Sequence, residues 1–243
     1  MSISLNCDLG EGYGIYRLGD DEAIMEFIDI ANVACGFHAS DPTVMRRTVA
    51  AAKENGVEVG AHPSLPDRQG FGRREMQLEP QEMVDLVTYQ VGALRGFLDA
   101  AGMPLRHIKP HGALYGMAAR DRRLSDALCT VAKSFGVPLM GLAGTHHEAA
   151  ARDAGVTLMA EFYADLDYLD DGNVIAPRVH EPIDPAKAVS RVQRAFTEGL
   201  VTTVGNHDLP VRASTICVHS DTPTAVEIAR QIALLLPVLP AAR

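Results

Sequence analysis

Short apolar runs alternate with longer amphipathic segments along most of the chain. The runs are brief and rich in Val, Ile and Leu, which is typical of buried parallel strands. They predict strands over residues 3–9, 29–36, 57–62, 106–112, 138–143, 156–165 and 214–220. Between them, apolar residues recur at intervals of three and four, which predicts helices over residues 42–56, 79–102 and 222–236.

Repeated strand-then-helix units predict a parallel sheet with right-handed crossovers. About seven such units without a break in composition favour one closed or nearly closed β/α barrel over residues 1–243, rather than a doubly wound sheet. Periodicity alone leaves that choice open. The one long irregular connection covers residues 167–184, and long loops in compact domains are often functional.

Composition excludes several classes of function. The chain has 243 residues, 47% of them hydrophobic, and a formal net charge of -9, without the basic stripe that a nucleic-acid surface needs. No run approaches the ~20 apolar residues that cross a bilayer, and the N-terminus lacks the pattern of a signal peptide. The four cysteines are widely spaced, so we expect reduced, buried thiols in a cytoplasmic protein with no membrane or nucleic-acid partner.

Ionisable residues follow six of the seven predicted strands. In parallel β/α proteins, active sites form just past the carboxyl ends of the strands, where these side chains can meet. The candidates are Asn6, Asp8, Glu11, His38, Asp41, His62, Asp67, Lys109, His111, Glu161, Asp165, His219 and Asp221. Their repeated position predicts one polar site at one rim of the barrel.

Several of these residues also have a purely structural interpretation. Asp41, Asp184 and Thr222 each precede a proline, which is the pattern of a helix N-cap followed by proline at the first helical position. Each histidine, taken singly, could be a hydrogen-bonded core residue. Four histidines at equivalent strand ends make that interpretation less convincing for the whole set.

Glu161 and Lys109 are the most informative charges. Glu161 lies inside an apolar strand, where an unpaired carboxylate would be very costly, so it needs a partner such as Lys109 or a ligand. Lys109 lies at a strand end and points either into the site or into the barrel core, where it would need a carboxylate. Its compact charge suits a phosphate or a developing oxyanion.

Common catalytic motifs do not explain the chain. It contains no Walker loop, no HExxH and no GxSxG. The spacing of His107 and His111 resembles a metal-binding pair only on a helix, and Pro110 between them argues against a helix. The sequence therefore leaves a divalent metal possible and its ligands unknown.

Several long blocks resemble the signatures of the LamB/YcsF family. They are LNCDLGEGYG, ANVACGFHASDPTVM, GAHPSLPDRQGFGRR, YQVGAL, KPHGALY and ICVHSD, in the family's order between residues 5 and 221. The resemblance implies a seven-stranded β/α barrel of the glycoside hydrolase/deacetylase type. It also implies ATP-dependent opening of 5-oxoproline to glutamate, together with two partner chains, 5-oxoprolinase subunits B and C.

The chain departs from the family pattern at Leu166, where the family usually has arginine. Arg73 and Arg178 are candidates to supply the missing phosphate or carboxylate contact. In the implied reaction, ATP phosphorylates the oxygen of a stable lactam so that water can attack it. Such a site needs a cation for the phosphate, a base for water and an acid for the leaving nitrogen.

These needs lead to a hypothesis for individual roles. Lys109 would stabilise phosphate or an oxyanion, and Asp8 and Glu161 would act as bases or metal ligands. His38, His62 and His111 would transfer protons or orient ligands. The remaining candidates would bind substrate or nucleotide: Asn6, Glu11, Asp41, Asp67, Arg73, Asp165, Arg178, His219 and Asp221.

Two alternatives stay open. Aspartate and histidine at strand ends would also suit a stand-alone metal-dependent deacetylase or amide hydrolase with an activated water. The chain could instead be a non-catalytic subunit that holds a small-molecule substrate while partner chains carry out the chemistry.

Overall fold

Seven parallel strands form a closed barrel in the computed structural model, which describes residues 3–177 and 179–240. Around the barrel the strand order is β1-β11-β6-β5-β4-β3-β2. The strands are β1 (Ser4–Leu9), β2 (Ile30–Ala34), β3 (Glu58–His62), β4 (Leu105–Ile108), β5 (Leu139–Gly141), β6 (Leu158–Tyr163) and β11 (Thr215–His219). All seven predicted strands are present, and the closed seven-stranded barrel is confirmed.

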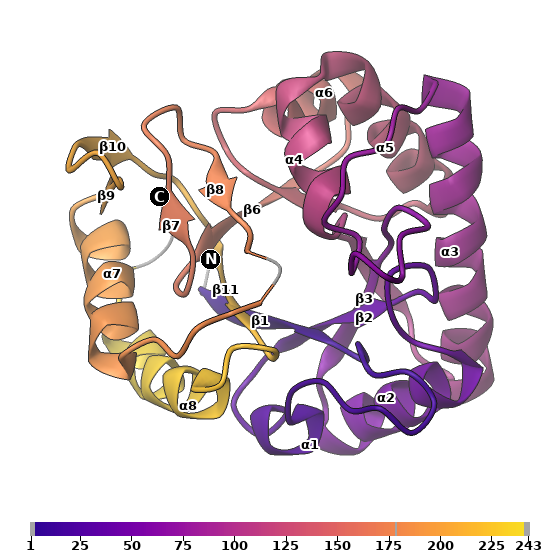
Figure 1. Ribbon diagram of the computed structural model, residues 1–243, viewed down its shortest axis with the longest axis horizontal. Helices are drawn as coiled ribbons and strands as arrows, with labels where there is room; N and C mark the ends of the chain where they lie inside the picture. Colours follow the sequence, from indigo (N-terminus) through magenta and orange to yellow (C-terminus); the bar gives the residue numbers. More distant parts are fainter. Residues whose placement is uncertain (1–2, 178, 241–243) are drawn as a thin grey trace.

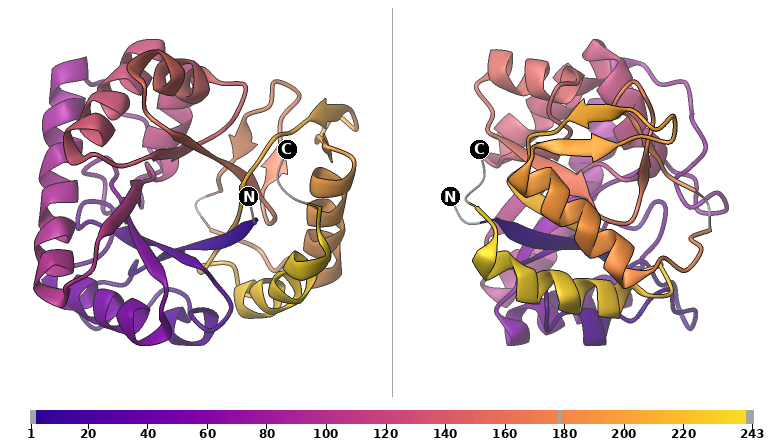
Figure 2. Two further views of the ribbon diagram at one scale, coloured as in Figure 1. Left: turned by 180° about the vertical axis from the view of Figure 1, so that it is seen from behind. Right: turned by 90° about the vertical axis from the view of Figure 1, so that its left-hand side faces the viewer.

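Helices surround the barrel (Figures 1 and 2). They are α1 (Asp21–Ile24), α2 (Pro42–Asn55), α3 (Pro80–Ala101), α4 (Gly112–Arg120), α5 (Arg122–Phe135), α6 (His146–Ala154), α7 (Pro185–Thr197), α8 (Ala225–Leu235) and the 3-10 turn η1 (Leu236–Val238). The predicted helices over 42–56 and 79–102 are confirmed as α2 and α3. The third is α8, which begins three residues later than predicted.

Two small antiparallel hairpins extend the barrel. They are β7 (Asp167–Tyr168) with β8 (Val174–Ile175), and β9 (Leu200–Thr202) with β10 (Asp208–Pro210). The connection expected to be irregular over 167–184 thus begins with a hairpin. Figure 1 shows β8 close to the centre of the view, in front of the strands that form the barrel wall.

Two of the three predicted helix caps are present. The carboxylate of Asp41 accepts hydrogen bonds from the first turn of α2, and Asp184 does the same for α7. The prediction for Thr222 is wrong, because Thr224 occupies the N-cap position of α8. The Thr222 hydroxyl donates instead to Asp165, 3.2 Å away, so a tertiary contact has replaced the local cap.

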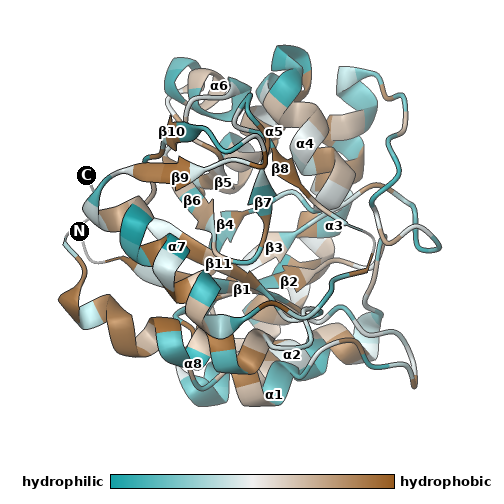
Figure 3. Ribbon diagram, turned by 60° about the vertical axis from the view of Figure 1, so that its left-hand side comes forward, coloured by the Kyte–Doolittle hydropathy of each residue, from teal (hydrophilic) through white to brown (hydrophobic). Residues whose placement is uncertain are grey.

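Alternation along the strands separates an apolar outer face from a polar inner one. On β1, Leu5, Cys7 and Leu9 belong to the hydrophobic core that packs under the helices. Asn6 and Asp8, between them, make their contacts inside the barrel. Figure 3 shows the strands mostly brown at the centre, whereas the exposed faces of helices such as α7 are largely teal.

The barrel interior is polar below the site as well. The Asn32 amide donates to Asn6 and to Asp8, each at 2.8 Å, and Oδ1 of Asn32 lies 2.6 Å from Nε2 of His107. The His107 ring occupies the space beside Gly60, where an added Cβ would lie 2.1 Å from the ring. A glycine at this strand position therefore lets an imidazole cross the interior.

Two expectations from composition bear on the fold. All four cysteines are buried free thiols, as predicted. Within residues 3–177 and 179–240, the helices are too short or too polar to cross a bilayer.

Candidate functional site

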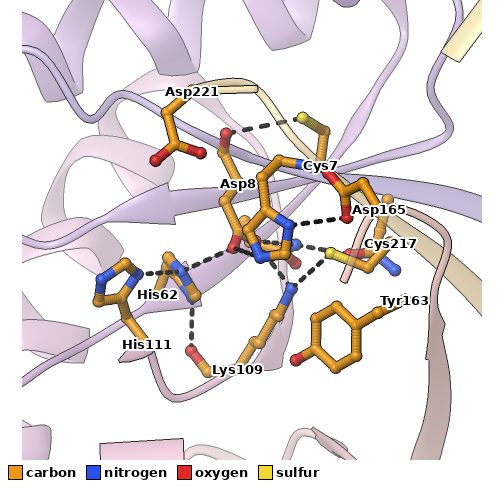
Figure 4. A network of polar contacts seen from close by, with 12 residues as sticks. Cys7, Asp8, His62, Lys109, His111, Tyr163, Asp165, Cys217 and Asp221 are labelled. Atoms are coloured by element: carbon orange, nitrogen blue, oxygen red, sulfur yellow. Dashed lines mark hydrogen bonds and ion pairs between the residues drawn. The ribbon is translucent and has the colours of Figure 1, made fainter. Parts of the chain in front are cut away.

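Side chains from several strand ends meet at one rim of the barrel (Figure 4). Lys109, just after β4, places Nζ 2.8 Å from Oδ1 of Asp8 on β1 and 3.1 Å from Oε2 of Glu161 on β6. His62, the last residue of β3, places Nε2 3.2 Å from the other oxygen of Asp8. The predicted convergence of these four residues is thus present in the structure.

Lys109 is buried between two carboxylates. Burial alone would lower the pKa of its ammonium group, but the charges around it, chiefly that of Asp8, raise this pKa well above its usual value. Burial would raise the pKa of Asp8, yet His62 and Lys109 hold it well below its usual range. The group therefore contains an ammonium and an ionised aspartate at neutral pH. Because its charge is already balanced, Lys109 is less free to bind phosphate than expected.

A second group contains Glu11, His38, His62 and His111. Oε1 of Glu11 lies 3.0 Å from Nε2 of His38 and 3.3 Å from Nδ1 of His111, which in turn lies 2.9 Å from Nε2 of His62. The rings of His38 and His111 stack at 3.8 Å. Burial, and then the charge of His38, lower the pKa of His111 to about 3, so an extra proton on this ring is costly.

A third group lies at the end of β11. Nδ1 of His219 is 3.0 Å from Asp165, and its Nε2 is 3.6 Å from Oδ2 of Asp8. Burial alone would lower the pKa of His219, but the carboxylate of Asp165 outweighs it and raises this pKa to about 9. His219 is therefore an imidazolium at neutral pH, in contact with the same aspartate as Lys109 and His62.

Arg73 and Asp221 close one side of the site. Their closest side-chain atoms are 3.4 Å apart, and the Arg73 guanidinium also donates to the carbonyl of Pro177. Nε of Arg73 is buried and has no hydrogen-bond partner among the described residues. Burial and the charge of Glu11 raise the pKa of Asp221 to about 6. Arg73 therefore retains an unused donor in a buried position.

A small cavity opens among these groups. Its volume is about 60 Å³, and its wall includes Asp8, His62, Arg73, Lys109, His111 and His219. Asn173, Val174 and Ala176, from the β7–β8 hairpin and the residue after it, form another part of the wall. The side chains with the strongest acid–base character thus face one enclosed space.

Three candidates have structural partners away from this cavity. Asp41 accepts from the backbone of Gly14 as well as from α2. Asp67 is paired with Arg74 and accepts from the backbone of Gly70. Asn6 lies deeper in the barrel, bound to Thr215 and Asn32. Arg178 lies outside the described residues.

Several polar residues of the site escaped the sequence reasoning. Cys217 lies 3.0 Å from Nζ of Lys109, and the Tyr163 hydroxyl donates to Glu161 over 3.0 Å. Asn32 joins Asp8 to His107, and His180 lies 3.1 Å from the Thr222 hydroxyl. Cys217, Tyr163 and Asn32 lie within apolar strands, where only their alternation with outward-facing residues would have identified them.

Two sets of buried side chains have spacings that could hold a metal ion. One is Glu11, His38, His62 and His111, and the other is Asp8, Cys217 and His219; in each set the ligand atoms lie within 4.8 Å of one another. The sets adjoin through the contact between His62 and Asp8. Imidazole and carboxylate donors of this kind suit divalent transition metals.

Known proteins resemble this chain over nearly its full length. One 5-oxoprolinase subunit, from Bacillus licheniformis, is 47% identical and covers 95% of this chain and 92% of its own. "Lactam utilization protein lamB" of Emericella nidulans is 46% identical over 92% of this chain and 90% of its own. The crystal structure of a lactam utilization protein from Thermus thermophilus superposes with a TM-score of 0.88, at 42% identity, and covers 100% of this chain and 99% of its own. The sequence profile of the LamB/YcsF family matches residues 3–237, and the chain belongs to that family.

Proposed function

We propose that the chain is one component of a multi-chain, ATP-dependent 5-oxoprolinase. The enzyme would open the lactam of 5-oxo-L-proline to L-glutamate while ATP is hydrolysed to ADP and phosphate. Relatives named as 5-oxoprolinase subunits, at 47% identity over nearly the full chain, support this substrate and a complex in which subunits B and C are the partners. The observation that carries the proposal is the balanced group of Asp8, Lys109 and His219 around one small cavity.

The chemistry explains why such a group is useful. Transfer of the γ-phosphoryl group of ATP to the lactam oxygen makes the ring carbon electrophilic. One water adds to that carbon, and protonation of the ring nitrogen lets the C–N bond break, which leaves γ-glutamyl phosphate. A second water then releases phosphate. The water needs a base and the nitrogen needs an acid, each within hydrogen-bond reach.

The described contacts suggest which residue takes each role. Asp8 is ionised and lines the cavity, so it serves as the base for water. His219 carries a proton at neutral pH and serves as the acid for the ring nitrogen. Lys109 keeps Asp8 ionised and stabilises the oxyanion from the side, since its ammonium is held by carboxylates. Arg73, with its unused Nε, binds the substrate carboxylate.

ATP is the co-substrate of this proposal, but the cavity limits where it can bind. Pockets for drug-sized ligands are typically ~300–1,000 Å³, whereas this cavity is about 60 Å³. We therefore place the adenosine outside the cavity, in a site completed by the partner subunits. Only the lactam and the phosphoryl group bonded to it would enter.

The test is turnover by the complex reconstituted with subunits B and C. Lys109→Ala should lower ATP-dependent glutamate formation by roughly 10²–10³-fold, as expected when a group that stabilises transition-state charge is removed. Lys187→Ala, at an exposed position of α7, is the matched control. Near-normal turnover of a folded Lys109→Ala complex would remove Lys109 from the mechanism. If this variant fails to fold, Lys109→Met/Glu161→Gln gives the same test with the net charge of the interior preserved.

One specific observation favours a second candidate function. The cluster of Glu11 and three histidines would also suit a stand-alone metal-dependent deacetylase or amide hydrolase. Amide hydrolysis by the isolated chain with added metal and without ATP would favour that function. Normal turnover of the complex with both Asp8→Asn and His219→Gln would instead give the chain a substrate-binding role only.

A further inference from the structure

The outer nitrogens of two histidines determine where their protons lie. Nδ1 of His62 is 2.8 Å from the carbonyl oxygen of Lys109, and Nε2 of His111 is 2.8 Å from that of Phe71. A carbonyl oxygen can only accept a hydrogen bond, so each of these nitrogens carries a proton. In the neutral form of each ring, the other nitrogen then carries a lone pair.

Those two lone pairs point at each other (Figure 4). Nε2 of His62 lies 2.9 Å from Nδ1 of His111. Each nitrogen also faces a carboxylate: His62 faces Asp8 at 3.2 Å, and His111 faces Glu11 at 3.3 Å. All four side chains are buried. With neutral rings, electron-rich atoms therefore meet without a proton between them, which favours a cation at this point.

We infer that Glu11, His62 and His111 bind a divalent transition-metal ion. Two atoms bound tetrahedrally at 2.0–2.1 Å would lie about 3.3 Å apart, close to the distances found between these donors. The backbone carbonyls on the outer nitrogens fix the tautomer of each ring, as such contacts do for metal-bound histidines. His62 and His111 line the cavity but Glu11 does not, so the remaining coordination position faces the substrate space.

His38 has a different part in this site. Its ring is parallel to that of His111, with 8° between the planes and 3.8 Å between the centroids. Two parallel, stacked rings cannot both direct an in-plane lone pair at one ion. Nε2 of His38 lies 3.0 Å from Oε1 of Glu11, so it donates to that carboxylate and orients it. His38 is therefore a positioning residue for the metal ligand Glu11.

The experiment measures metal binding by the full chain, without ATP, substrate or partner subunits. Chain stripped with a chelator is titrated with Zn²⁺ and with Co²⁺, and bound metal is measured by elemental analysis and by the visible absorption of Co²⁺. We expect one ion per chain. His62→Gln and His111→Gln should each weaken binding by more than about 100-fold, and His38→Gln by about 10–100-fold. His146→Gln, at an exposed histidine of α6, should bind like wild type.

A second measurement on the wild-type chain keeps the test valid if a variant misfolds. In ¹⁵N spectra of the imidazole rings, metal should shift His62 and His111 and leave His107 unchanged. The inference fails if the stripped chain takes up neither ion stoichiometrically, or if folded His62→Gln binds like wild type. These measurements involve no turnover, so their outcome is independent of the proposed lactam chemistry.

Discussion

The ammonium of Lys109 lies 2.8 Å from the carboxylate of Asp8, although β4 and β1 are separated by two strands in the sheet. The contact therefore crosses the barrel. Glu161 approaches the same ammonium from β6. One lysine thus joins three strands and balances two buried carboxylates at the base of the cavity.

Removing this lysine should destabilise the fold. Lys109→Met leaves two buried carboxylates without their cation, which should lower the free energy of unfolding by about 3–5 kcal/mol. Lys109→Met/Glu161→Gln, in which one charge of each sign is removed, should recover part of that loss. Urea unfolding of the three proteins at neutral pH measures this. Equal stability of the single variant and wild type would show that the ion pair contributes little to folding.

His219 should make stability depend on pH in the alkaline range. Its pKa in the folded chain, about 9, is raised above the ordinary 6.5. The stabilisation is therefore complete below pH 6.5 and is lost as the pH rises through 9. At most about 3 kcal/mol is involved. The measurement is the difference in unfolding free energy between wild type and His219→Gln at several pH values. A difference that stays constant from pH 6 to pH 10 would contradict the raised pKa.

Gly60 should tolerate no side chain. Gly60→Ala would place a Cβ 2.1 Å from the ring of His107, and both residues lie inside a closed barrel. Overpacking of this kind typically costs about 1–3 kcal/mol, which thermal or urea unfolding can detect. Gly92→Ala is the control, because a Cβ at that position of α3 has open space around it. This change should be neutral or stabilising by up to about 1 kcal/mol, since alanine favours helix.

Arg73 should determine how well the carboxylate of the substrate is bound. Arg73→Lys keeps the positive charge but loses the planar, bidentate geometry, so we expect a higher KM for 5-oxoproline with a smaller change in kcat. A lactam without the carboxylate should respond much less to the substitution. Arg95→Lys, at an exposed position of α3, is the control. If both lactams respond equally, Arg73 does not contact the substrate carboxylate.

The roles of Asp41 and Asp67 show why a position at a strand end is not sufficient evidence of function. Both lie in loops after strands, as predicted. The Asp41 carboxylate is occupied by backbone amides of α2 and Gly14, and that of Asp67 by Arg74 and its own loop. Local pattern placed these residues at the correct edge of the barrel. The direction of each side chain depends on loop geometry, which local pattern does not specify.

The amino-acid sequence by itself determined the seven strand-and-helix units, their parallel order and the rim at which the ionisable residues gather. These features follow from local periodicity and from the common direction of the strands. Only the tertiary structure decided that the sheet closes, that Lys109 lies between Asp8 and Glu161, and that His62 faces His111. The physical reason is that these contacts join residues far apart in the chain, so they depend on strand register and barrel closure rather than on neighbouring residues.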